Sequence, residues 1–134
     1  MIAVVCVDDR GGMAFNRRRQ SMDRLLRADL IKEAGGRTLW MSEYSRRQFE
    51  EAAASLRTAE RFWEEAGGEE LCFFETADPA PWLGEARALV VYRWNRRYPA
   101  DLYFSGPPEG WKLARREEFP GSSHEKITKE VYVP

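Results

Sequence analysis

Two clusters of arginine residues are the most distinctive chemical feature of the sequence. The first cluster is Arg17, Arg18 and Arg19, and it is followed directly by Gln20 and Ser21. Guanidinium groups bind phosphate and carboxylate oxygens through paired N–H donors. A helix that begins at Ser21 would add backbone N–H groups to the same site. The pattern predicts an anion-binding site, with Gln20 and Ser21 as neutral hydrogen-bond partners.

The second cluster follows an apolar segment near position 90. Its members are Arg93, Asn95, Arg96 and Arg97. Taken singly, each cluster is also typical of solvated loop charge. Taken together, so many arginines in a chain of net charge −1 need acidic residues or a bound anion to compensate them. We therefore expect a phosphate-bearing ligand, a nucleotide or RNA, with Trp94 and Tyr98 as candidate surfaces for stacking bases.

The single histidine, His124, lies in a polar turn between Ser123 and Glu125. An imidazole near arginines can act as a general base in phosphodiester cleavage or acyl transfer. A polar turn residue in a hairpin is the alternative interpretation. The sequence has no serine-hydrolase elbow, Walker loop or zinc-protease motif. One histidine also excludes metal-dependent nuclease chemistry of the metallo-β-lactamase type, and we expect no metal.

Length and composition indicate one domain. A chain of 134 residues is long enough to bury a core without metals or disulfides. Cys6 and Cys72 lie inside apolar runs, so we expect both to be buried thiols. No apolar stretch approaches the roughly 20 residues that span a membrane, and no basic leader precedes the first strand, which predicts a cytoplasmic protein. The small net charge argues against a protein that coats nucleic acids generally.

The first 41 residues predict a strand, a loop, a helix and a second strand. The apolar run 1–9 indicates a strand covered on both faces, and a pair of glycines begins a polar loop. Ser21 is a candidate N-cap, with Asp23 in the first turn of the helix. Two further glycines end the helix before the strand 38–41.

The later segments predict a sheet with further helices. Ser45 is expected to cap an alanine-rich helical region over 46–65, as one helix or two. The remaining elements are strands over 71–74, 88–94 and 102–104, a loop or short helix over 77–82, and a C-terminal hairpin of 111–114 and 125–133. Strands that alternate with helices and close on a hairpin predict a three-layer α/β domain with a mixed sheet.

Most of the chain resembles dihydrofolate reductase. The segments VDDRGGMAFN and TLWMSEYS match the family's acidic turn with its glycine-containing loop and its second strand. LVVYRWNRRYPADLYF resembles the late strand, loop and short strand, and GWKLARREEF with EKITKEVYV resembles the closing hairpin. Only one helical region fits between Phe49 and Leu71, where the reductases have two further strands. The resemblance implies that the two arginine-containing loops and the turn around His124 are neighbours.

Residues that bind folate and cofactor in that family are replaced in this chain. Leu26 stands where the first helix carries its acid, and Ser21 stands where a tryptophan precedes that helix. Ser-Glu at 42–43 and Glu-Thr at 75–76 replace the glycine-containing pairs that approach the nucleotide phosphates. An acid at either place repels phosphate. The resemblance therefore implies a protein that lacks ordinary reductase activity and holds no cofactor.

Three functions follow as hypotheses. The first is a binding module for a phosphate-bearing ligand at the arginine-rich edge. The second is an enzyme, either a divergent NADP-dependent reductase in which Asp23 or Asp29 replaces the missing acid, or a metal-free hydrolase that uses His124. The third is an interaction protein or homodimer that pairs through a sheet edge exposed by the missing strands.

Overall fold

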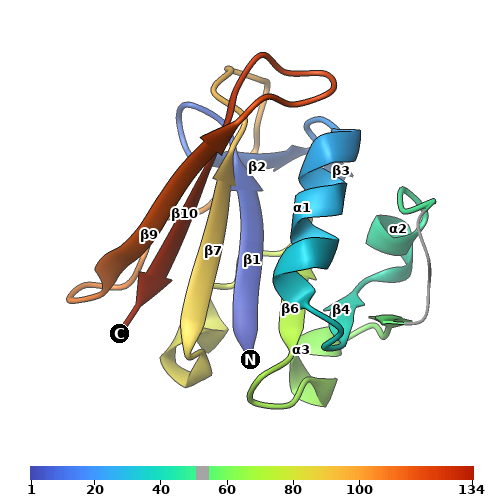
Figure 1. Cartoon of the computed structure of the whole chain (residues 1–134), viewed down its shortest axis with the longest axis vertical. Helices are drawn as coiled ribbons and strands as arrows, with labels where there is room; N and C mark the ends of the chain where they lie inside the picture. Colours follow the sequence, from blue (N-terminus) through green and yellow to red (C-terminus); the bar gives the residue numbers. More distant parts are fainter. Residues whose placement is uncertain (51–54) are drawn as a thin grey trace.

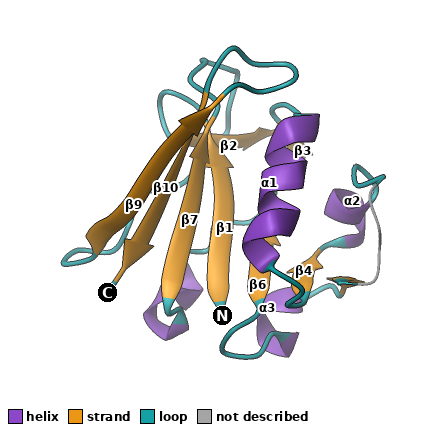
Figure 2. Cartoon of the chain, in the orientation of Figure 1, coloured by secondary structure: helices purple, strands orange, loops and turns teal. Residues whose placement is uncertain are grey.

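The computed structural model describes residues 1–50 and 55–134 as a mixed α/β domain (Figure 1). Seven strands form a large sheet in the order β5-β4-β6-β1-β7-β10-β9, and three form a small sheet in the order β3-β2-β8. The large sheet consists of β1 (Ile2–Val7), β4 (Leu39–Met41), β5 (Leu56–Thr58), β6 (Leu71–Phe74), β7 (Ala88–Arg93), β9 (Lys112–Phe119) and β10 (Ile127–Val133). The small sheet consists of β2 (Gly12–Phe15), β3 (Arg18–Arg19) and β8 (Leu102–Tyr103). The helices, purple in Figure 2, are α1 (Arg24–Ala34), α2 (Glu43–Arg46), α3 (Phe62–Glu65) and the 3₁₀ helix η1 (Ala80–Glu85).

Strand β1 lies at the centre of the large sheet. It pairs in parallel with β6 on one side and with β7 on the other. Its side chains alternate between two buried clusters, with Val4 in one and Val5 in the other. A strand buried on both faces needs no polar alternation, which is why its sequence is a continuous apolar run. The prediction of a covered strand at the start of the chain is confirmed.

Helix α1 covers one face of the sheet (Figure 1) and buries Leu26, Leu30 and Ala34. Residues three or four positions apart lie on the same side of a helix, so this spacing gives one apolar stripe. Side chains from α3 and η1 cover the opposite face, where the rings of Trp63 and Trp82 stack with centroids 4.3 Å apart. The prediction of an α/β domain with a mixed sheet is confirmed at this level.

Both predicted N-caps are wrong by a few positions. Asp23, and not Ser21, caps α1, because its carboxylate accepts hydrogen bonds from two backbone N–H groups of the first turn. Ser42, and not Ser45, caps α2, and its hydroxyl accepts from the Ser45 N–H. An N-cap must reach the free N–H groups two or three positions ahead, and only these two residues do so.

The helical region expected over 46–65 is also wrong. Strand β5 interrupts it and pairs in parallel with β4, with Leu56 opposite Leu39. Both leucines are buried in the same cluster, so packing on the sheet overrides the helical propensity of this alanine-rich segment. Ala52 and Ala53, which belong to the expected apolar stripe, lie outside the described residues.

Two further elements differ from their expected bounds. The polar loop over 16–20 contains part of a hairpin, because β2 and β3 pair in an antiparallel manner. Strand β9 continues to Phe119, well beyond the expected end at Ala114, and β10 begins only at Ile127. The side chains of β9 are almost all exposed, so its sequence lacks the apolar alternation that marks a half-buried strand.

Cys6 and Cys72 are buried and free, as expected. Burial raises the pKa of Cys72 to about 12, so its thiol stays protonated at neutral pH. Among the described helices, none is long and apolar enough to cross a lipid bilayer.

Candidate functional site

The C-terminal ends of β1 and β7 lie beside the loops that carry the predicted site residues (Figure 1). The buried carboxylate of Asp8, at the end of β1, holds two of these loops together. Its Oδ2 accepts hydrogen bonds from Gln20 Nε2 at 3.0 Å and from the backbone N–H of Tyr98 at 3.2 Å. Gln20 also donates to the carbonyl of Pro99. The loop after β1 and the loop after β7 are therefore neighbours.

Asp8 is ionised in this position. Burial raises its pKa, but hydrogen bonds from three backbone N–H groups and from Gln20 outweigh burial and lower it. Gly12 lets the loops approach, since a Cβ there would lie 2.6 Å from the Cβ of Ala100. Asp8 is not among the residues predicted from the sequence, although an acid that ends a strand before two glycines is a signal for such a turn.

Asp23 links the start of α1 to the β9–β10 turn. Its carboxylate accepts hydrogen bonds from the backbone N–H groups of Ser122 and Ser123, at 3.0 and 2.8 Å. Nδ1 of His124 lies 2.9 Å from Asp23 Oδ2. Burial would raise the pKa of Asp23, but His124 and the backbone donors lower it far below its usual range. The carboxylate therefore carries its full charge at neutral pH.

His124 is buried, and both of its ring nitrogens have partners. Because the ionised Asp23 can only accept, Nδ1 carries a proton and Nε2 is the acceptor in the neutral ring. The hydroxyls of Tyr98 and Ser21 lie 2.9 and 3.2 Å from Nε2. The ring stacks on the buried Trp94, with centroids 4.6 Å apart. Trp94 therefore supports His124, and this face of its ring is not available for a base.

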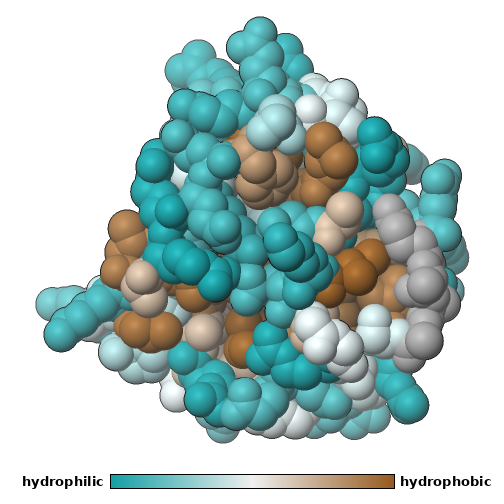
Figure 3. Space-filling view, viewed as in Figure 1, coloured by the Kyte–Doolittle hydropathy of each residue, from teal (hydrophilic) through white to brown (hydrophobic). Residues whose placement is uncertain are grey.

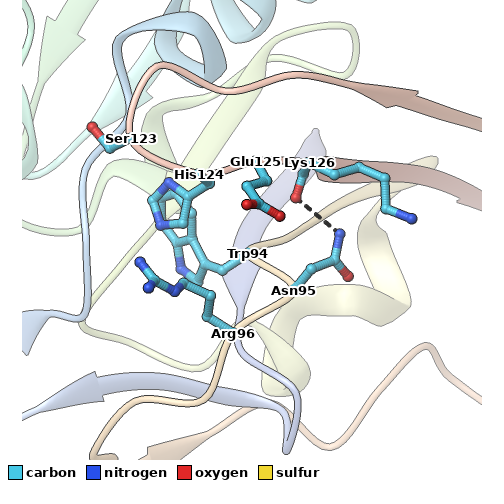
Figure 4. Close-up of a pocket in the computed structure, with 7 residues that line it drawn as sticks. All are labelled: Trp94, Asn95, Arg96, Ser123, His124, Glu125 and Lys126. Atoms are coloured by element: carbon cyan, nitrogen blue, oxygen red, sulfur yellow. Dashed lines mark hydrogen bonds between the residues drawn. The ribbon is translucent and has the colours of Figure 1, made fainter.

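A cavity of about 550 Å³ lies beside His124. Its walls come from the end of β7 and from the β9–β10 turn. Figure 4 shows the guanidinium of Arg96 on the same side of the cavity as the rings of Trp94 and His124. The carboxylate of Glu125 lines the cavity as well, so the walls carry charges of both signs.

Asn95 holds the loop after β7 against the β9–β10 turn. Its Nδ2 donates to the carbonyl of Lys126 at 3.0 Å, dashed in Figure 4, and to Thr128 Oγ1 at 2.9 Å. Its φ of 58° lies in the left-handed region, which asparagine adopts more readily than most residues. Asn95 therefore shapes the cavity wall, and its amide N–H groups are engaged within the protein.

Arg17 and Arg18 lie at the tip of the β2–β3 hairpin. Phe15 pairs with Arg18, which leaves Asn16 and Arg17 as a two-residue turn with φ of 51° and 61°. Hairpin turns with left-handed φ at both positions favour glycine at the second. Arg17 therefore holds an unfavourable backbone conformation while its side chain is exposed. With Thr76 and others it lines a second cavity of about 510 Å³.

Arg19 and Arg93, two of the predicted anion ligands, are paired within the protein. Nε of Arg19 lies 3.2 Å from both carboxylate oxygens of the buried Glu75, and Gln48 donates to the same carboxylate. Burial raises the pKa of Glu75, although Arg19 and Gln48 favour its charged form. Arg93 pairs with Glu130 at 2.7 Å. Each of these arginines thus compensates an acid of the chain itself.

Asp29, the other candidate acid, belongs to an ion-pair cluster between α1 and β10. It accepts a hydrogen bond from the hydroxyl of Tyr92 at 2.6 Å and pairs with Lys129 at 2.8 Å. Lys129 also binds Glu33 at 2.6 Å. Asp29 is therefore committed to these partners, whereas Asp23 contacts His124.

Four of the predicted arginines are exposed and form no ion pair within the described part of the chain. They are Arg17, Arg18, Arg96 and Arg97. Figure 3 shows a hydrophilic surface over the end of the molecule where the loops lie. Arg10 and Arg24 are also exposed beside these loops, although neither belongs to the two arginine clusters of the sequence. Their places in the sequence could have identified them as candidates. Arg10 follows the acidic turn at the end of β1, and Arg24 follows Asp23, the N-cap of α1.

Within residues 1–50 and 55–134, no group of three or more histidine, cysteine, aspartate or glutamate side chains is arranged to hold a metal ion. No protein-family model matches the sequence, and no curated protein shows significant similarity to it. The chemical features of this end of the sheet are the contacts among Ser21, Asp23 and His124 and the exposed arginines of the neighbouring loops.

Proposed function

We propose that the protein binds a phosphate-bearing small molecule of nucleotide size at an arginine-rich edge, defined as Arg17, Arg18, Arg96 and Arg97. One observation carries the proposal. These guanidiniums are exposed on neighbouring loops and have no acidic partner among the described residues, whereas the arginines next to them are paired. Like charges gathered in this way repel one another, and a bound anion removes that repulsion.

The two cavities at this end of the sheet suit a ligand of that size. Their volumes of about 550 and 510 Å³ fall within the range of small-molecule sites. Arg96 lines the first cavity and Arg17 lines the second, so a phosphate held by either one would leave the rest of the ligand in a hollow. Single-stranded RNA carries the same phosphate groups and needs no cavity. The binding experiment described below therefore includes a short RNA as a second ligand.

The fold that we propose for this function is a shortened dihydrofolate-reductase-like fold. Its support is the strand, loop, helix and strand unit at the start, the parallel centre β6-β1-β7 and the closing hairpin of β9 and β10. Strand β5 adds one strand in the middle of the chain, where that family has two.

The buried Glu75 argues against a dinucleotide cofactor in such a fold. It follows β6, at the position of the family's glycine pair, and Arg19 and Gln48 already bind its carboxylate. We expect a titration with reduced NADP, followed by tryptophan fluorescence, to give no saturable quenching up to millimolar concentration. Saturable binding at micromolar concentration, about −8 kcal/mol, would return the reductase hypothesis to first place.

The binding test uses fluorescence anisotropy with a labelled adenosine nucleotide and with a labelled short single-stranded RNA. The double variant Arg17→Ala/Arg18→Ala should weaken binding and flatten its salt dependence, by a slope of about 0.7 per arginine for single-stranded RNA. Lys32→Ala/Lys112→Ala is the matched control, because both lysines are exposed and lie away from these loops. Equal affinity and salt slope in the two double variants would reject the arginine-rich edge as the site.

A further inference from the structure

We infer that Ser21 is a nucleophile and that the site hydrolyses a carboxylic ester or thioester whose leaving group carries a phosphate. The phosphate in this substrate class rests on the proposed function, but the nucleophile does not. Ser21 Oγ lies 3.2 Å from His124 Nε2, and His124 Nδ1 lies 2.9 Å from Asp23 Oδ2. A hydroxyl, an imidazole and a carboxylate in this order activate serine on several unrelated folds.

The base in this arrangement is held in one orientation. The side chains of His124 and Asp23 are 1% and 0% exposed, so the charge of Asp23 acts on the imidazole with little screening by water. Trp94 stacks on the ring and the backbone donors of the β9–β10 turn fix the carboxylate. Asp23 is thus a positioning residue that keeps the proton on Nδ1 and leaves the lone pair of Nε2 to the hydroxyls of Tyr98 and Ser21.

Ser21 is partly exposed, and a second hydroxyl, that of Tyr98, lies beside its own. The backbone N–H of Met22, the next residue in the chain, donates to no acceptor in the described part of the chain. The hydroxyl of Tyr98 lies 3.4 Å from Ser21 Oγ and shares Nε2 with it. When a substrate carbonyl binds, Tyr98 can donate to its oxygen, and this change leaves the lone pair of Nε2 to Ser21.

The reaction balances with this chain's own groups and water. Ser21 Oγ forms a bond to the carbonyl carbon, and His124 Nε2 takes the hydroxyl proton. The bond from that carbon to the leaving oxygen or sulfur breaks, and His124 returns the proton to the leaving group. Water then attacks the acyl-serine with His124 again as the base, which releases the carboxylic acid and regenerates Ser21.

The test is covalent labelling of the full chain with a small fluorophosphonate, located by peptide mass mapping. We expect a single adduct at Ser21 that is absent in Ser21→Ala. Ser105→Ala is the control, because Ser105 is exposed in the loop after β8 and its hydroxyl has no hydrogen-bond partner in the described chain. This variant should label as the wild type does. His124→Asn keeps an amide donor where Nδ1 contacts Asp23 but lacks Nε2, and labelling should slow at least about 100-fold.

Several outcomes would overturn the inference. A folded wild-type protein without an adduct at Ser21 rejects the nucleophile, and wild-type labelling in His124→Asn rejects the base. The substrate class is tested by hydrolysis of an acetyl thioester of a phosphate-bearing thiol, compared with the same thioester without its phosphate. The phosphate should lower KM, and Arg96→Ala, which removes the guanidinium at the cavity beside His124, should abolish that difference. Equal KM values for the two thioesters would reject the phosphate requirement. Labelling uses no phosphate, so a failed nucleophile and a failed anion site give different results.

Discussion

His124 donates a hydrogen bond from Nδ1 to the carboxylate of Asp23 across 2.9 Å, although 101 positions separate the two residues in the chain. The same carboxylate caps helix α1 and accepts two backbone N–H groups from the β9–β10 turn. One acid therefore fixes the start of the first helix, the turn of the last hairpin and the imidazole. Stability and the proposed chemistry depend on the same contact.

Asp23→Asn should destabilise the protein in a pH-dependent way. The N–H₂ group of asparagine would replace one carboxylate oxygen and point at N–H donors, with no acceptor to bind. We expect the free energy of unfolding at neutral pH to fall by about 3 kcal/mol. The folded pKa of Asp23 is lowered below its unfolded value near 3.9, so its stabilisation is complete above that value and is lost as the pH falls toward the folded pKa. Urea unfolding from pH 7 to pH 2 should show the gap between wild type and variant closing in acid. The exposed Asp9→Asn serves as the control, and a gap that stays constant with pH would contradict the role assigned to Asp23.

Gly121→Ala should disturb the same turn from the other side. A Cβ at this position would overlap the carboxylate of Asp23 and lie 2.9 Å from the carbonyl of His124. Overpacking against backbone and a fixed charge costs about 2 kcal/mol. Thermal unfolding measures this loss against Gly68→Ala, where a Cβ would meet no atom within 4 Å. Equal melting temperatures for the two variants would show that the turn can relax.

Two neighbouring arginines of the first cluster should have different roles: Arg19 stabilises the fold, and Arg18 binds the anion. Arg19→Ala leaves the buried Glu75 without its cation, and we expect a loss of about 3 kcal/mol in unfolding free energy. Arg18→Ala removes an exposed side chain and should change stability by less than about 0.5 kcal/mol while it weakens anion binding. Chemical unfolding and anisotropy on both variants provide the comparison. The reverse pattern would mean that Arg19, and not Arg18, faces the ligand.

Arg17→Gly should stabilise the protein and weaken binding at the same time. The left-handed φ of 61° at this position costs an arginine more than a glycine. After the greater chain entropy of glycine is subtracted, the net gain is about 0.5–1 kcal/mol. Arg17→Ala removes the same guanidinium without relieving the backbone, so it separates the two effects. A stability gain in Arg17→Ala equal to that of Arg17→Gly would exclude backbone strain as the cause.

The sequence predicts the parts of this fold that depend on local pattern. The apolar run that became β1 and the stripe of α1 have the periods expected of a buried strand and an amphipathic helix. Strand β5 could not be predicted, because Leu56 belongs to a segment rich in helix formers and is held as a strand by pairing with β4. Pairing of two copies through a sheet edge stays a prediction. The edge nearest the missing strands is β5, where Arg57 and Thr58 are exposed.

The sequence shows which charged and titratable residues belong to the candidate site, but not which of them contact one another. The arginines and His124 stand out as charged or titratable groups in loops, and the structure places their loops at one end of the sheet. Sequence spacing could not show that Glu75 neutralises Arg19, because 56 positions separate them. Nor could it show that Asp23 contacts His124. Contacts between residues so far apart in the sequence are determined by the order of the strands in the sheet.

Strand β10 inserts between β7 and β9, and the turn that precedes it carries the donors for Asp23. During synthesis on the ribosome, α1 and its cap emerge long before that turn exists. Asp23 can then cap the helix, but the other donors for its charge have not yet been made, and closing a loop of this length is slow. The proposed chemistry at Ser21 therefore requires a turn whose histidine is synthesised 101 positions after Asp23.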